Sequence, residues 1–182
     1  MLADAPESIR DAFLEALYST VRSNPAARTR GVPLSGGARR ASELMLAYQF
    51  DNPQSQSFGT QLLYLQTLIL MGLEAENHGP ALGRGPPKAA WLGAAVGIVY
   101  NLKLHSNRMS REKLASGDPD SDEKLGRRAW WVLVVLDRWH AISTSSPLFI
   151  PDLSVSLLLE DQTILGAAPY HIASKYDEST SK

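Results

Sequence analysis

The four histidines are the side chains best suited to acid–base or metal chemistry in this sequence: His78, His105, His140 and His171. Each lies in a different segment and no His-Glu-x-x-His pair occurs, whereas zinc needs three or four converging ligands. Asp137 lies three residues before His140, so the two can touch on a helix, an arrangement more typical of a structural hydrogen bond than of catalysis. We therefore predict no metal site and no catalytic site at these residues.

Other motifs with known chemistry are incomplete. The run Asp118-x-Asp120-x-Asp122 resembles the start of a calcium loop, but it lacks the glycine at position six and the acid at position twelve. Residues 79–85 are glycine-rich but lack the Gly-Lys-Ser/Thr that grips phosphates. The chain has no cysteine, which excludes disulfides and thiolate metal sites within it. We predict that it is not an enzyme and holds no cofactor of its own.

Composition is that of an ordinary globular domain. The 182 residues include 18 basic and 19 acidic side chains, for a net charge of -1. Domains that bind nucleic acid by themselves usually carry a basic excess, so direct DNA binding by this chain is not expected. The longest nearly apolar stretch, 89–100, is shorter than the roughly 20 residues of a membrane span. We expect a soluble, intracellular protein without a membrane partner.

Apolar periodicity and Gly/Pro punctuation predict helices and little strand. The expected helices cover residues 6–23, 39–50, 57–76, 87–105 and 118–143. The predicted fold class is therefore all-α, an irregular multi-helix domain of about five to six helices. It is expected to span residues 1–173, with a polar, frayed tail over 174–182.

Spacing in two of these helices predicts the buried face. In the first, one set of apolar residues shares a face: Ile9, Phe13, Ala16, Leu17 and Val21. In the fourth, Gly93 and Gly97 are four residues apart and also share a face. Because the stretch is too short for a membrane, this spacing favours close packing of another helix in a soluble core.

The fifth predicted helix carries two apolar faces. One face combines Trp130, Leu133, Val134, Asp137 and Ala141. An adjacent face combines Trp131, Val135, Arg138 and Ile142. Because residues 129–136 are apolar nearly all round, we expect this helix to be central to the core.

Two charged residues, Asp137 and Arg138, follow directly after the apolar residues 129–136. Neighbours in a helix point about 100° apart, so we expect Asp137 and Arg138 not to pair with each other and each to need its own partner. Arg127 lies near Trp131 and can stack on its ring. Two interpretations stay open: a polar network that fixes the packing of this helix, or a charged wall of an internal ligand cavity.

The same region resembles the signature of the fungal-specific transcription factor domain. That signature combines Arg-Arg, Trp-Trp, an apolar run, Leu-Asp-Arg, and then Pro-Leu with an acidic residue. The residues that carry the resemblance, and that form the candidate site, are Arg127, Arg128, Trp130, Trp131, Asp137, Arg138, His140 and Pro147. The family usually has Gly-Arg before its Pro-Leu, where this chain has Ser145-Ser146. The resemblance is strongest over 58–152, and the Asp137–His140 variant looks like the branch related to glucose-responsive regulators of sugar transporters.

The resemblance implies an all-helical regulatory domain from the middle of a zinc-cluster transcription factor that controls RNA polymerase II transcription in the nucleus. Such proteins bind DNA, often as dimers, through an N-terminal zinc cluster held by cysteines. DNA and zinc are therefore expected only through a module missing from this chain. A small-molecule effector, a second copy and transcriptional co-regulators are the implied partners. Because the family continues with further helices at its C-terminal end, the resemblance also implies that this domain is partial, or truncated. The alternatives left open are a standalone helical small-molecule sensor and a non-functional fragment.

Overall fold

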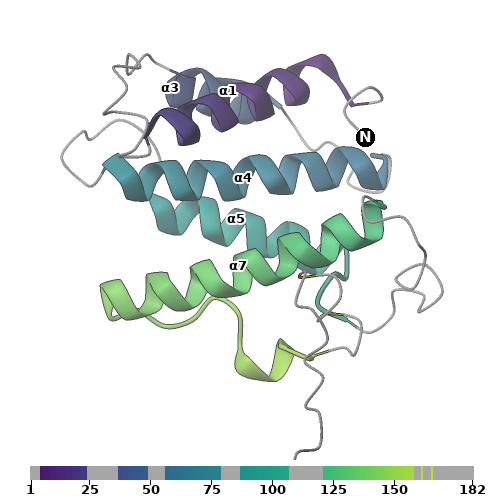
Figure 1. Ribbon diagram of the computed structural model, residues 1–182, viewed down its shortest axis with the longest axis vertical. Coiled ribbons are helices and arrows are strands. Elements are labelled where there is room, and N and C mark those ends of the chain that lie inside the picture. Colours follow the sequence, from purple (N-terminus) through teal and green to yellow (C-terminus); the bar gives the residue numbers. More distant parts are fainter. Residues whose placement is uncertain are drawn as a thin grey trace, which may run out of the picture.

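The computed structural model is built from helices (Figure 1). It describes residues 5–23, 37–48, 56–78, 87–106, 121–157, 161 and 165. Within these ranges the chain forms no strand, which confirms the all-α prediction. The elements are α1 (Glu7–Ser23), α3 (Gly37–Ala47), α4 (Phe58–His78), α5 (Lys88–Asn101), α7 (Asp122–Thr144) and the short 3-10 helix η3 (Asp152–Ser154). No helix in the described part of the chain combines the length and apolar character that crossing a membrane requires.

Helix α4 lies at the centre of the molecule. It has α1 and α3 on one side and α5 and α7 on the other, as Figure 1 shows. Its buried apolar residues occur all round the helix: Leu62, Leu63, Leu65, Leu68, Ile69 and Met71. A helix that is apolar on every side is stable only when neighbours cover every side. The leucine-rich composition of α4 therefore accounts for its central position.

The buried face of α1 overlaps the predicted one but is rotated from it: Ile9 and Ala16 are buried as predicted, whereas Leu17 and Val21 are not. Leu17 and Val21 are 36% and 56% exposed. The buried positions are Ile9, Ala12, Ala16, Ser19 and Ser23. Most of these side chains are small, which allows α1 to approach α4 closely enough for direct polar contacts. Ser19 Oγ donates to Glu74 Oε1 at 3.2 Å, and Thr20 Oγ1 lies 3.1 Å from the carbonyl oxygen of Leu70.

Two tyrosines join the end of α3 to α4. The rings of Tyr48 and Tyr64 lie 5.7 Å apart, and the Tyr48 hydroxyl donates to Gln56 Oε1 at 2.9 Å. Burial raises the pKa of both phenols above the ordinary value of 10.0, and the proximity of Tyr48 raises the pKa of Tyr64 further. Both groups are therefore neutral at physiological pH and serve as a packed aromatic contact.

Helix α5 does not pack through its glycines. A Cβ atom built on Gly93 or Gly97 meets no atom within 4 Å, so the predicted close helix contact at this face is wrong. The helix instead buries its larger residues: Trp91, Leu92, Ala95, Val96 and Val99. These side chains remove more apolar surface from water than glycines do, and they decide which side of α5 faces α4.

Helix α7 lies at the edge of the stack rather than at its centre (Figure 1). One side is buried, through Gly126, Arg127, Ala129, Trp130, Leu133, Val134, Leu136, Asp137 and His140. The opposite side exposes Val132, Val135, Trp139 and Ile142. The expectation that this helix is central is therefore wrong, because α4 occupies the centre and covers only one side of α7.

A left-handed residue ends α7 and turns the chain back along it. Ser145 has φ 52° and ψ 36°, and its N–H and that of Ser146 both donate to the carbonyl of Ala141. This is the usual hydrogen-bonding pattern of a helix that ends in a left-handed residue, a position where glycine is favoured. Lys103, at φ 57°, ends α5 in a similar way, so this helix stops at Asn101 and short of the predicted His105. Residues 145–157, here called the return segment, then run back beside α7 (Figure 1).

Replacing Ser145 by glycine is expected to stabilise the protein. A left-handed conformation costs a residue with a Cβ roughly 1–2 kcal/mol, and glycine adopts it freely at some cost in chain entropy. We expect Ser145→Gly to raise the free energy of unfolding by about 1 kcal/mol in urea titrations. The matched control, Ser143→Gly, lies within the last helical turn and should lower it by about 1 kcal/mol. Equal effects of the two substitutions would contradict this account.

Candidate functional site

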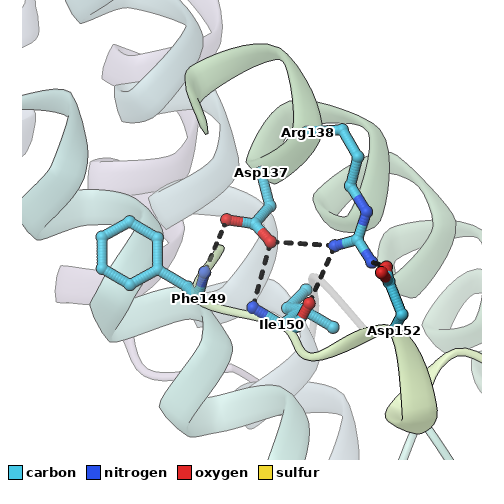
Figure 2. A network of polar contacts seen from close by, with 5 residues as sticks. All are labelled: Asp137, Arg138, Phe149, Ile150 and Asp152. Carbon is cyan, nitrogen blue, oxygen red and sulfur yellow. Dashed lines mark hydrogen bonds and ion pairs between the residues drawn. The ribbon is translucent and has the colours of Figure 1, made fainter. Parts of the chain in front are cut away.

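The candidate site is built around the buried carboxylate of Asp137, on the side of α7 that faces the return segment. The carboxylate is fully buried. Its Oδ1 accepts the N–H of Phe149 at 3.0 Å, and its Oδ2 accepts the N–H of Ile150 at 3.0 Å (Figure 2). A buried charge is tolerated only when such donors replace the water it has lost. Asp137 thus fixes two consecutive backbone groups of the return segment against α7.

Arg138 completes the same network from the next position on the helix. Its Nη1 donates to Asp137 Oδ2 and to the carbonyl oxygen of Ile150, each at 3.0 Å, and its Nη2 donates to Asp152 Oδ1 at 2.6 Å (Figure 2). The prediction that Asp137 and Arg138 do not pair is therefore wrong. The 100° between the two side chains is bridged because the long arginine side chain folds back toward the return segment, where both groups find partners.

His140 and Pro147 belong to the same end of α7. His140 is buried and its ring stacks on that of Phe149, with centroids 6.0 Å apart and planes inclined by 7°. Among the described residues no hydrogen bond joins His140 to Asp137, whose oxygens are occupied by the return segment. Pro147 is exposed in the return segment.

Arg127 makes a second anchor nearer the start of α7. Its side chain is fully buried and forms a two-pronged ion pair with Asp161, through Nε to Oδ1 at 2.6 Å and Nη2 to Oδ2 at 2.7 Å. It also donates to the carbonyl oxygens of Leu104 at 3.1 Å and Ser156 at 2.7 Å. The guanidinium carbon lies 5.4 Å from the Trp131 ring centroid, which confirms the predicted stacking.

The two tryptophans occupy different environments. Trp130 is fully buried and its ring lies 6.2 Å from that of His105. Trp131 is half-buried beside Arg127, and Arg128 is also half-buried. Among the described residues, four polar atoms are buried without a hydrogen-bond partner, and all belong to the first half of α7 or to chain that precedes it: His105 Nδ1, Ser121 Oγ, Trp130 Nε1 and Trp131 Nε1.

The structure thus separates the predicted site residues into two polar anchors and their apolar surroundings. Asp137 and Arg138 hold one part of the return segment, and Arg127 holds another. Described His, Cys, Asp and Glu side chains form no group of three that could bind a metal ion. The geometry is that of a polar network that positions a segment of chain, the first of the two interpretations. The ligand-cavity interpretation stays a prediction.

Sequence reasoning missed the partners contributed from outside α7. Asp152 follows a proline in the family signature, and this acidic position was the available signal for it. Asp161 lies 34 residues from Arg127, and no local pattern connects the two. The backbone carbonyls of Leu104 and Ser156 could not be predicted as partners from the sequence either, because every residue has a backbone carbonyl.

Comparison with known proteins places this arrangement in a family. Residues 20–168 match the fungal specific transcription factor domain, and the chain belongs to that family. The chain is also 42% identical over 171 residues to the uncharacterized transcriptional regulatory protein C320.03 of Schizosaccharomyces pombe. That match covers 92% of this chain but 19% of the yeast protein, so the chain spans about a fifth of its relative's length. No solved structure matches the chain.

The comparisons agree with the resemblance seen in the sequence at the level of the family. The family and the relative are transcriptional regulators. The narrower assignment to the branch of sugar-transporter regulators stays a prediction. The matched region includes α7 and the return segment, so both polar anchors lie inside it.

Replacing Asp137 by asparagine is expected to destabilise the fold strongly. Asparagine has one acceptor oxygen, and its amide group would face a donor from the return segment or from Arg138. Removing one partner of a buried charged network costs roughly 3–5 kcal/mol. The control is Asp152→Asn, because the Asp152 side chain is 83% exposed. An exposed pair contributes about 0–1 kcal/mol. Urea unfolding curves that give equal losses for both variants would contradict the central role of Asp137.

The Arg127–Asp161 pair is expected to behave as one unit. Arg127→Met leaves a buried carboxylate and two carbonyls without their donor, and should cost about 3–5 kcal/mol. Combining it with Asp161→Leu should cost less than the sum of the two single substitutions, as measured by a double-mutant cycle. The control is Arg39→Met in the exposed Arg39–Glu43 pair, with an expected loss of at most about 0.5 kcal/mol. Strict additivity at Arg127 and Asp161 would contradict the coupling.

Proposed function

We propose that this chain is the regulatory, or middle, domain of a zinc-cluster transcription factor that controls RNA polymerase II transcription in the nucleus. In this proposal DNA is bound by a separate module that carries the zinc cluster, since the chain itself has no cysteine. The domain holds no metal or cofactor of its own and catalyses no reaction. Its contribution is a folded surface that controls the activity of the module linked to it.

The observation that carries this proposal is the position of the family's signature in the structure. Asp137 and Arg138, which match the signature, are the residues that hold the return segment on α7. A network of this kind specifies one arrangement of the chain, because a partly satisfied buried charge is costly. A domain that is recognised by transcriptional co-regulators needs such a defined surface.

A small-molecule effector is a second proposed partner. It is favoured by the partnerless buried atoms Trp130 Nε1, Trp131 Nε1 and His105 Nδ1, because buried polar atoms usually have partners. A standalone sensor would use the same atoms without any link to transcription. The experiment below distinguishes these two roles.

The test joins the 182-residue chain to an unrelated DNA-binding module in fungal cells that carry a reporter gene. We expect reporter transcription to differ from that of the DNA-binding module alone. The Asp137→Asn variant should lose this difference because the return segment is released, whereas Asp152→Asn should keep it. Protein levels and nuclear location are measured for each fusion.

Two other outcomes would favour other roles. Equal reporter transcription with and without the chain, at matched nuclear protein levels, would contradict the regulatory role. The standalone sensor would be favoured by two results together. The fusion would leave reporter transcription unchanged, and a metabolite would raise the thermal stability of the 182-residue chain.

A further inference from the structure

The end of α7 carries a row of hydroxyl side chains followed by a proline: Ser143, Thr144, Ser145, Ser146 and Pro147. Ser146–Pro147 is the one place in the sequence where proline directly follows a serine or a threonine. Residues 144, 145 and 147–149 are exposed, and Ser146 is half-buried. Proline disfavours the helical conformation in the residue before it, and Ser146 lies just beyond the end of α7 at Thr144.

The Ser146 hydroxyl is the donor in a chain of hydrogen bonds that ends on α7. Thr144 Oγ1 donates to the carbonyl oxygen of His140 at 2.7 Å, and it lies 2.8 Å from Ser146 Oγ. A hydroxyl group has one hydrogen to donate. Because Thr144 donates its hydrogen to His140, Ser146 supplies the hydrogen between the two hydroxyls. The proton of Ser146 thus joins the first residues of the return segment to the last turn of α7.

This end of α7 is also sensitive to added negative charge. Its last carbonyl groups give the helix end a partial negative charge, and the last turn holds no basic residue to offset it. A phosphate on serine carries about −1.5 to −2 charges at pH 7 and offers acceptor oxygens, and it disrupts structure when it lies at a helix C-terminus. On Ser146 it would replace the hydroxyl proton and repel the helix end.

We propose that Ser146 is the acceptor site of a proline-directed serine/threonine kinase, and that its phosphorylation loosens the return segment from α7. The kinase transfers the γ-phosphoryl group of ATP. A bond forms between Ser146 Oγ and the γ-phosphorus, the bond from this phosphorus to the leaving oxygen of ADP breaks, and the hydroxyl proton passes to a base of the kinase. The inference goes beyond the proposed function and does not depend on it, because it concerns a modification of the chain and its local stability.

The contacts that phosphorylation weakens lie directly after Ser146 in the chain. Phe149 and Ile150 donate their N–H groups to Asp137, and Ile150 is fully buried. When the return segment opens, a phosphate on Ser146 is hydrated and no longer faces the helix end. Phosphorylation therefore destabilises the closed arrangement without an equal penalty in the open one. Local opening that exposes Ile150 becomes more frequent.

The first test incubates the folded 182-residue chain with a recombinant proline-directed kinase of the cyclin-dependent class and magnesium ATP. We expect one phosphoryl group per chain by intact mass, located on Ser146 by mass spectrometry of the peptides. The matched variants are Ser146→Ala, which lacks the acceptor, and Pro147→Ala, which keeps the whole row of hydroxyls. Both should remain unmodified. No incorporation into the unchanged chain, or equal incorporation into either variant, would overturn the proposal.

The second test measures hydrogen exchange at the amides of Phe149 and Ile150 by NMR. We expect exchange roughly tenfold faster in the phosphorylated chain, because a hydrogen bond is lost and a charge faces the helix end. The amide of Leu65, in the central helix α4, should exchange at an unchanged rate and serves as the internal control. Unchanged exchange at Phe149 and Ile150, or an equal increase at Leu65, would overturn the proposed loosening.

The unphosphorylated Ser146→Ala variant separates charge from hydrogen bonding. It lacks the hydroxyl donor but carries no added charge, so its exchange at Phe149 and Ile150 should increase less than that of the phosphorylated chain and should not depend on salt. The increase caused by phosphate should become smaller as salt screens the charge. An equal, salt-independent increase in both proteins would contradict the electrostatic part of the proposal.

Discussion

The packing of the C-terminal part of this domain depends on one buried carboxylate. Asp137 accepts the N–H groups of Phe149 and Ile150, and it shares Arg138 with the carbonyl of Ile150. These bonds satisfy the buried carboxylate of Asp137 and the buried N–H of Ile150, which would otherwise lack partners, so the helix and the return segment require each other. Ile150, which is fully buried, is the apolar side chain that this polar arrangement sets against the core.

The position of each helix in the stack depends on how many of its sides are apolar. Helix α4 is apolar on every side and occupies the centre, whereas α1 and α7 each bury one side and leave large side chains exposed on the other. In α1 the buried side is formed largely by small residues, and its contact with α4 is reinforced by hydrogen bonds from Ser19 and Thr20. Close approach and polar complementarity there outweigh the burial of larger side chains.

The structure shows which contacts the residues of the family signature make in this chain. Three of its charged residues form two anchors: Arg127 binds Asp161 and two backbone carbonyls, and the Asp137–Arg138 pair binds the return segment. Both anchors join α7 to chain that follows it in the sequence, and Arg127 also joins α7 to Leu104, which precedes it. The signature of this transcription factor family is therefore, in this chain, a set of residues that gives the domain one defined shape.

The sequence by itself determined approximately where the helices lie and that Arg127 stacks on Trp131, because these properties depend on residues close together in the chain. Only the tertiary structure decided which face of α1 and α7 is covered, that Gly93 and Gly97 face open space, and that Asp161 is the partner of Arg127. Helical periodicity defines the faces of a helix, but the neighbours that compete for the centre select among them. The pairing of Asp137 with Arg138 also depends on the tertiary structure. The return segment brings backbone N–H groups to Asp137 and a backbone carbonyl to Arg138, and so holds the two side chains together.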